Sequence, residues 1–427
     1  MHISKHISFI ALLFILFLPN IGLAQKLVSK PFVGAVDEHS IRVWSLFKNI
    51  DSVRFMIVDE QQNIISTSLN IFDKKIAFKQ YFPIISHFEN LKPNTTYQVK
   101  YILDGTEYNL LLVKTESYGN EDFSFLTGSC AFVGTSFNRM VKPFNNLKIL
   151  NSMEQDTAQL MLWLGDNLYY IFEKNSYRRQ LKRNIQVRLN KRMSAFLNSK
   201  AQYAIWDDHD FGANNSGAEF KNKKSSLNVF QQFWANPKNE TLNYFTFKKQ
   251  DVQFFMLDDR FYKEDSTALG VVQLTWLKES LLQSDATFKI IGIGTQALNR
   301  SGTHESFYNA KAEFDELMAF ISDNKISGIF FITGDRHFAE LVKMDSIIAY
   351  PLYDFTTSPI SMYPLKKKAS EQISNPSIEG TYYNKNNYGK ISIVGAAEDR
   401  KCILELKNRA GETLWQYIIP AKELQFQ

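Results

Sequence analysis

Cysteine is scarce in this 427-residue chain, which contains only Cys130 and Cys402. Two cysteines allow at most one disulfide within the chain, so a scaffold built from several disulfides is excluded. Cys130 ends a predicted strand beside a group of polar motifs, whereas Cys402 lies in a late β segment. We therefore favour Cys130 as a free thiolate ligand, with a disulfide between the two cysteines as the alternative.

An excess of one charge is also lacking, because the formal net charge is only +5 at pH 7. This small charge gives no reason to expect a nucleic-acid-binding module or a membrane-surface partner. After residue 24 no apolar run is long enough to span a bilayer, and we find no internal repeat or low-complexity tract. The length predicts two folded units, and we expect a monomer.

The one prominent apolar run lies at the start of the chain. Lys5 precedes the apolar stretch Ile7–Leu18, and the small residues of Gly22–Ala24 precede Gln25. This pattern predicts a secretory signal peptide over residues 1–24, with a short membrane anchor as the alternative. No cysteine follows the expected cleavage site, which excludes a lipoprotein anchor. We expect the mature protein to be exported, and so periplasmic or secreted.

Residues 25–115 show the pattern of a small all-β module. Short alternating segments separated by turn residues predict strands at Ser40–Phe47, Ser52–Val58, Thr96–Leu103 and Asn109–Lys114. This spacing indicates a β-sandwich. The run Leu91–Tyr97 resembles the tyrosine corner of fibronectin type III-like modules. Residues 116–122 are polar and rich in turn formers, and they read as a linker.

The rest of the chain, residues 123–427, alternates strand and helix signals. Six apolar strands end in polar residues, at Phe123–Cys130, Leu160–Asp166, Tyr203–Asp208, Val252–Asp259, Phe288–Gln296 and Gly328–Asp335. Helices are predicted at Ser176–Asn198, Val271–Gln283 and Ala310–Asp323, and β-hairpins return at Lys390–Pro420. Strands with polar carboxyl ends are typical of an α/β protein whose site lies along one sheet edge. The first helix is strongly basic; we favour a solvated face over attraction of an anionic substrate.

Five motifs at these strand ends carry the candidate chemistry. They are Gly128-Ser129-Cys130, Gly165-Asp166-Asn167-Leu168-Tyr169, the cluster Asp207–Asn215, Leu257-Asp258-Asp259-Arg260, and Gly334-Asp335-Arg336-His337. Only five histidines follow residue 24, and two of them lie in these motifs. Carboxylates, an imidazole, a phenolate and a thiolate suit a trivalent or transition metal beside a hard divalent cation.

The order of these motifs resembles that of the PhoD-like alkaline phosphatases and phosphodiesterases, a family of the metallophosphatase superfamily. The most telling segments are Trp206–Asp210 and Thr333–Leu341. The resemblance covers residues 123–420, and the preceding sandwich is similar to the N-terminal module of that family. It implies an α/β metallophosphatase-type core of two packed mixed sheets flanked by helices.

The resemblance also implies a ferric iron and calcium, with other divalent metals as alternatives. Carried over by motif, the iron ligands would be Cys130, Asp166, Tyr169, Asp335 and His337. Asp166 could bridge towards calcium, and Asn214 would be a calcium ligand, with Asn215 as the alternative. Tyr169 could instead be a packed aromatic residue after its strand.

Three further residues are candidates for the reaction itself. They are Asp208, His209 and Arg260: a proton could reach the leaving oxygen from His209, and Arg260 could bind a phosphoryl oxygen. The alternative for all three is a hydrogen-bond network that orients the ligands. We expect Arg336 to point to solvent and His304 to lie in an exposed loop.

These features predict an exported phosphoesterase that hydrolyses phosphate mono- or diesters by attack of metal-activated hydroxide. The alternative is a non-catalytic cell-surface or glycan-binding protein that retains the fold. The intact set of Cys130, Asp166, Asp335 and His337 favours the enzyme. The sequence does not distinguish monoester from diester substrates. The loop Asp354–Lys368 could cap the pocket.

Overall fold

The computed structural model describes residues 26–72, 78–134, 147–170, 176–238 and 242–426. The predicted signal peptide lies outside the described residues. Within them, no helix is both long enough and apolar enough to cross a membrane.

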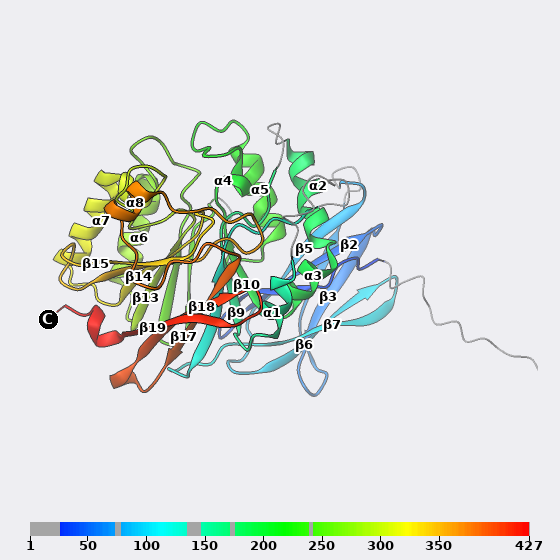
Figure 1. Cartoon of the computed structure of the whole chain (residues 1–427). Helices are drawn as coiled ribbons and strands as arrows, with labels where there is room; N and C mark the ends of the chain where they lie inside the picture. The colour runs from blue at the N-terminus through cyan, green and yellow to red at the C-terminus, as the bar shows by residue number, and fades with distance from the viewer. Residues whose placement is uncertain (1–25, 73–77, 135–146, 171–175, 239–241, 427) are drawn as a thin grey trace, which may run out of the picture.

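The N-terminal region forms two antiparallel sheets, drawn in blue and cyan in Figure 1. One sheet contains β1 (Phe32–Val36), β2 (Ile41–Lys48) and β5 (Tyr81–Phe88); the other contains β3 (Ser52–Val58), β4 (Ile64–Ile71), β6 (Thr96–Leu103) and β7 (Thr106–Lys114). Side chains from both sheets form one hydrophobic core, which includes Val43, Phe55 and Val99. The predicted all-β sandwich is therefore present, and it has three strands, β1, β4 and β5, that the sequence pattern did not identify.

The tyrosine corner is also present, because the hydroxyl oxygen of Tyr97 accepts a hydrogen bond from the Lys92 N–H at 2.9 Å. The residues that follow are fixed to the core and do not act as a free tether. Glu116 forms an ion pair with Lys249 at 2.5 Å, and Asp122 forms one with Arg400 at 2.8 Å. The predicted linker 116–122 thus joins two units that are held in contact. The exact domain boundaries stay predictions.

Two six-stranded mixed sheets make up the core. The first has the order β10-β9-β8-β17-β18-β19 and the second has the order β11-β12-β13-β14-β16-β15. The first sheet comprises β8 (Phe123–Gly128), β9 (Leu160–Leu164), β10 (Ala201–Ile205), β17 (Asn387–Val394), β18 (Lys401–Asn408) and β19 (Thr413–Pro420). The second comprises β11 (Phe245–Lys249), β12 (Val252–Met256), β13 (Phe288–Ile293), β14 (Ile329–Thr333), β15 (Glu340–Met344) and β16 (Leu352–Thr356).

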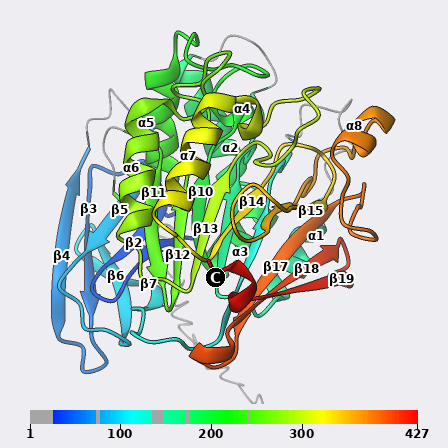
Figure 2. The same cartoon turned by 90° about the vertical axis from the view of Figure 1, so that its left-hand side faces the viewer.

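The two sheets pack face to face, with helices outside each of them. In β9, Leu162 belongs to the cluster shared with the second sheet, whereas Trp163 packs on the helix side. Both faces of β9 are apolar because one is covered by the second sheet and the other by helices, as expected for parallel strands. In Figure 2, α6 (Gly270–Leu282) and α7 (Lys311–Asp323) lie side by side over β12 and β13. The predicted core of two packed mixed sheets flanked by helices is confirmed.

The other helices are α1 (Ile149–Gln155), α2 (Tyr177–Arg188), α3 (Lys191–Asn198), α4 (Asp208–Phe211), α5 (Lys223–Phe233) and α8 (Ala369–Ser374). The single basic helix predicted over Ser176–Asn198 was wrong. The helix is interrupted before Asn190, whose side chain caps α3 by accepting hydrogen bonds from two backbone N–H groups. Its predicted solvated face was also wrong in part, because Arg183 and Arg188 are buried.

Candidate metal centre

The site lies where parallel strands of both core sheets end. Cys130 comes after β8, Asp166 after β9 and His337 after β14. These ends approach closely at Gly334, where a Cβ would lie 2.5 Å from the Leu164 carbonyl oxygen and 2.7 Å from the Ser129 Cβ. Any side chain at residue 334 would push the strand ends apart.

Cys130, Asp166 and His337 form the first group of potential ligands, and their ligand atoms lie within 4.8 Å of one another. The Cys130 thiol donates to Asp166 Oδ2 at 3.6 Å. The Tyr169 hydroxyl donates to the same oxygen at 2.9 Å and lies 3.4 Å from His337 Nε2. Tyr169 therefore faces the group of ligands and is more than a packed aromatic residue.

Asp166, Asp208 and His209 form a second group within the same 4.8 Å limit. Asp166 belongs to both groups, an arrangement in which one carboxylate can bridge two cations. Asp208 and His209, predicted as catalytic residues, thus stand where they could also bind a metal. Because two carboxylates and an imidazole converge here, the geometry permits either role.

Asp335, Asn214 and Asn215 line a cavity together with Asp166, Asp208 and His337, but they join neither group. The Asp335 side chain is 30 % exposed, and its Oδ2 lies 4.0 Å from Arg336 Nε. Asn214 is exposed and donates a hydrogen bond to Asn215 Oδ1 at 2.8 Å. Their predicted metal roles stay predictions.

Four of the predicted ligands have left-handed backbone conformations. The φ angles are +56° at Cys130, +53° at Asp166, +66° at Asp335 and +57° at His337. Such angles are uncommon for residues with a side chain and cost about 1–3 kcal/mol each unless local contacts compensate. Backbone strain of this kind is concentrated at functional sites, so its presence at these four residues, which follow three strand ends, supports their role.

The three carboxylates of the cluster Asp207–Asp210 do not all face the groups of potential ligands. Asp208 faces the second ligand group. Asp207 instead pairs with the buried Arg260, and Asp210 Oδ2 accepts a hydrogen bond from the Asn167 N–H at 3.1 Å. The single turn of α4 points neighbouring carboxylates in different directions, so only one of the three belongs to a group of potential ligands.

Burial and mutual repulsion dominate the electrostatics of the site. Burial, with the nearby Cys130 and Asp208, raises the pKa of Asp166 well above its ordinary value. Burial also raises the pKa of Cys130 to about 11 and, with Asp166, raises that of Tyr169. Burial lowers the pKa of His337. The protein alone therefore does not favour the anionic ligand forms, and a bound cation would.

A metal fits the residues present. Asp208 Oδ1 is buried and has no hydrogen-bond partner among the described residues, and such an atom is costly unless a cation or water satisfies it. Thiolate, phenolate and imidazole ligands suit a transition metal, and carboxylates also suit a hard divalent ion.

A model of the PhoD-like phosphatase family matches residues 129–400, more than half of the chain. The chain belongs to the PhoD-like phosphatase family. This relationship supports a phosphoesterase, a hydrolase that acts on phosphate esters. A search of curated protein sequences gave no match.

Solved structures show the same fold. The structure of PhoD has a TM-score of 0.73 at 15% sequence identity, covering 93% of this chain and 89% of that chain. A purple acid phosphatase, PPD1 from yellow lupin (Lupinus luteus) seeds, has a TM-score of 0.63 at 11% identity, covering 92% of this chain and 74% of that chain. At these identities the likeness concerns the fold alone.

In this PhoD-like phosphatase both ligand groups open onto a cavity of about 750 Å³. Tyr363, from the loop predicted to cap the pocket, lines it, and its ring lies 5.0 Å from that of His337. The cavity is also lined by the cationic side chains of Arg260, Lys263, Arg336, Lys366 and Lys368. His304 lines the cavity too and is less exposed than expected, because its Nε2 lies 3.9 Å from Glu371.

Arg260 has a more enclosed position than a substrate-binding residue needs. It is fully buried, and its guanidinium contacts Asp207, Glu305 at 2.7 Å and Asp259 at 3.6 Å. Burial lowers its pKa, but these carboxylates outweigh that effect and raise the pKa above its ordinary value. These contacts favour the hydrogen-bond-network alternative over direct binding of a phosphoryl oxygen, and its role stays a prediction.

The predicted exposure of Arg336 was wrong, because its side chain is buried and paired with Glu371. The sequence analysis also missed Glu371, Gln296 and Asn299, which surround this arginine. No local pattern points to them. The one available signal was an arginine between two predicted ligands, where an uncompensated positive charge would oppose a bound cation.

Proposed function

We propose that this protein is a metal-dependent phosphoesterase that acts on phosphate mono- or diesters outside the cytoplasm. The convergence of Cys130, Asp166 and His337, with Asp166 shared by a second group, is the observation that supports it. The proposed iron would be held by these residues with Tyr169 and Asp335. The proposed calcium would lie on the side of Asp166 and Asn214.

Bound metal ions would polarise the phosphoryl group and lower the pKa of the attacking water. The protein residues would hold those ions and manage protons. His209 would transfer a proton to the leaving oxygen; this role is supported because its side chain is 26 % exposed, lines the cavity, and has its Nε2 3.9 Å from Asp208 Oδ1. Its ring packs on that of Tyr169 with centroids 4.5 Å apart, which limits its orientations.

Hydrolysis of p-nitrophenyl phosphate and bis(p-nitrophenyl) phosphate tests the proposal, with iron and calcium supplied. Asp166→Asn should lower the rate by more than about 100-fold, since both metals would lose a ligand. Asp285→Asn, at a carboxylate 85 % exposed, should have no effect. The ratio of the two rates in the wild type gives the monoester or diester preference.

Two results would contradict the proposal. One is full activity in Asp166→Asn, and the other is activity that ignores metal removal. A rate that peaks at acid pH would count against the proposed water attack, because that water must lose a proton. Export is tested separately: the mature protein from the native host should begin at Gln25.

A further inference from the structure

Arg336 lies between two predicted metal ligands, yet its side chain turns away from the solvent. The side chain is 5 % exposed, and that of its partner Glu371 is 0 % exposed. Arg336 Nη1 and Nη2 donate to Glu371 Oε1 and Oε2 at 2.6 and 3.0 Å. Two parallel hydrogen bonds of this kind fix the orientation of both groups.

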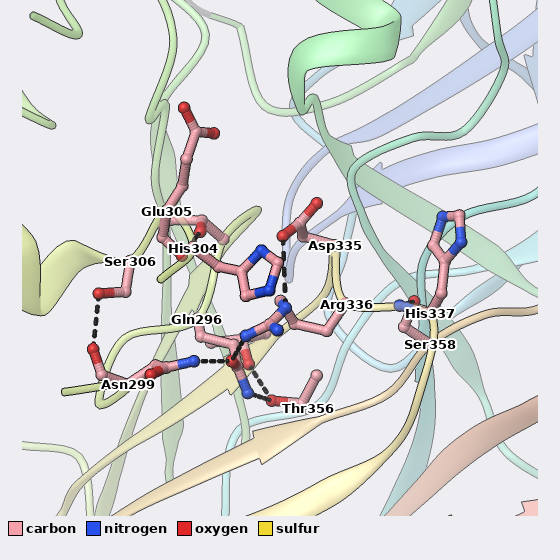
Figure 3. Close-up of polar contacts among 12 residues, drawn as sticks. Gln296, Asn299, His304, Glu305, Ser306, Asp335, Arg336, His337, Thr356 and Ser358 are labelled. Carbon is pink, nitrogen blue, oxygen red and sulfur yellow. Dashed lines mark hydrogen bonds and ion pairs between the residues drawn. The ribbon is translucent and has the colours of Figure 1, made fainter. Parts of the chain in front are cut away.

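Glu371 also connects Arg336 to Asn299 and Gln296, which belong to the segment that leads to His304. Asn299 donates from Nδ2 to Glu371 Oε1 at 2.8 Å and to Gln296 Oε1 at 2.7 Å, and Arg336 Nη1 donates to the same Gln296 oxygen at 2.6 Å. Figure 3 shows Arg336, Gln296 and Asn299 converging in this way. The carboxylate on α8 thus ties the loop that carries His304 to the turn that carries His337.

The turn needs such support because of its backbone. Asp335 and His337, on either side of Arg336, both have positive φ angles, and residues in this region are held there by surrounding contacts. The His337 N–H donates to Ser358 Oγ at 2.9 Å, which fixes one end of the turn. The anchored Arg336 side chain fixes its middle.

The pair also balances charge. A guanidinium next to a cation site would oppose metal binding through Coulomb repulsion, which is strong in a poorly solvated interior. Glu371, which belongs to neither ligand group, neutralises that charge through its ion pair with Arg336. Both effects of Glu371 act in the same direction, because each favours metal at His337 and its neighbours.

We propose that Glu371 and Arg336 are positioning residues of the metal centre: the pair holds the Asp335–His337 turn in its ligand-binding conformation. This inference rests on the proposed function, since it requires a metal. The competing explanation is that the pair merely attaches α8 to the core. The two explanations predict different metal affinities.

The test measures iron retained by the full-length mature protein against increasing concentrations of a chelator. Glu371→Gln keeps the shape of the side chain and removes its charge, and Arg336→Lys keeps the charge and loses the two parallel bonds. We expect the apparent iron affinity to fall about 10- to 100-fold in each variant. Circular dichroism measures the folded fraction of each variant. If Glu371→Gln does not fold, the iron affinity of Arg336→Lys decides between the two explanations.

Asp251→Asn is the matched control. Asp251 forms the same type of two-bond pair with Arg400, at 3.0 and 2.9 Å, and Arg400 is fully buried. This pair lies by the linker, so its loss should lower stability and leave iron affinity unchanged. An equal fall in iron affinity in all three variants would overturn the inference. So would wild-type iron affinity in folded Glu371→Gln and Arg336→Lys. Either result would leave the proposed function standing. A wild type that binds no metal would overturn the proposed function as well.

Discussion

Replacing Arg260 with methionine should lower the free energy of unfolding by about 3–5 kcal/mol, the usual cost of removing one partner from a buried ion pair. The structure supports the upper part of this range. Asp207 and Asp259 are both buried, and each already has one carboxylate oxygen without a hydrogen-bond partner among the described residues. Without the guanidinium, both carboxylates would face an interior with no compensating cation from the protein.

Urea unfolding followed by tryptophan fluorescence measures this loss, from the shift of the midpoint at constant slope. Lys278→Met provides the control, because Lys278 forms its 2.6 Å ion pair with a half-exposed Glu316. Removing that surface pair should cost about 1 kcal/mol or less. A loss of 3 kcal/mol is a large part of the about 5–15 kcal/mol that stabilises an ordinary domain.

The same variant distinguishes the two roles of Arg260. If it mainly holds carboxylates in place, stability falls sharply and the Michaelis constant of the folded fraction changes little. If it binds a phosphoryl oxygen, stability stays within about 1 kcal/mol of the wild type and kcat/KM falls by about 100-fold or more. The second result would refute the reasoning from burial and pairing.

Three further predictions follow from other parts of the fold. Burial lowers the pKa of Lys289 to about 8, so above that pH the unfolded state binds more protons than the folded state. The free energy of unfolding should therefore rise between about pH 8 and pH 10. In urea titrations, Lys289→Met should remove about 2–3 kcal/mol of that rise. The buried Arg188 guanidinium lies 4.4 Å from the centre of the Trp234 ring. In the same assay Arg188→Ala should lower the free energy of unfolding by about 3 kcal/mol. Arg188→Met should lower it clearly less, because methionine fills the space without a buried charge. Tyr363→Ala should raise KM about three- to tenfold for aryl phosphates and leave KM for methyl phosphate unchanged, since only an aromatic group can stack there.

The sequence predicted the strand ends that build the site for a simple physical reason. An apolar run that stops at Cys130, Asp166 or Asp335 marks the end of a strand, and parallel strands place such ends at one edge of the sheet. These strand ends predicted a metal site at one sheet edge, and the resemblance to the PhoD-like family assigned Cys130, Asp166 and His337 as its ligands. The hydrophobic pattern of the sequence also separated the β-sandwich from the α/β core, because the two regions have different hydrophobic periods.

Other features depend on contacts that no local pattern encodes. The direction of the Asp207 carboxylate depends on Arg260, 53 residues later in the chain, and that of Asp210 depends on Asn167, 43 residues earlier. The pairing of Arg336 with Glu371 spans 35 residues, and it reversed the expectation that this arginine faces solvent. The break at Asn190 was hidden by strong helix formers on both sides, and only its capping role explains it.

Metal content of the purified mature protein, compared with that of Cys130→Ala, tests the central claim most directly. Elemental analysis should find about one transition-metal ion per chain in the wild type, expected to be iron, and a clear loss in the variant, because a thiolate ligand is removed. No bound transition metal in the wild type, with hydrolysis indifferent to Cys130, would contradict the account and favour a binding protein that keeps only the fold.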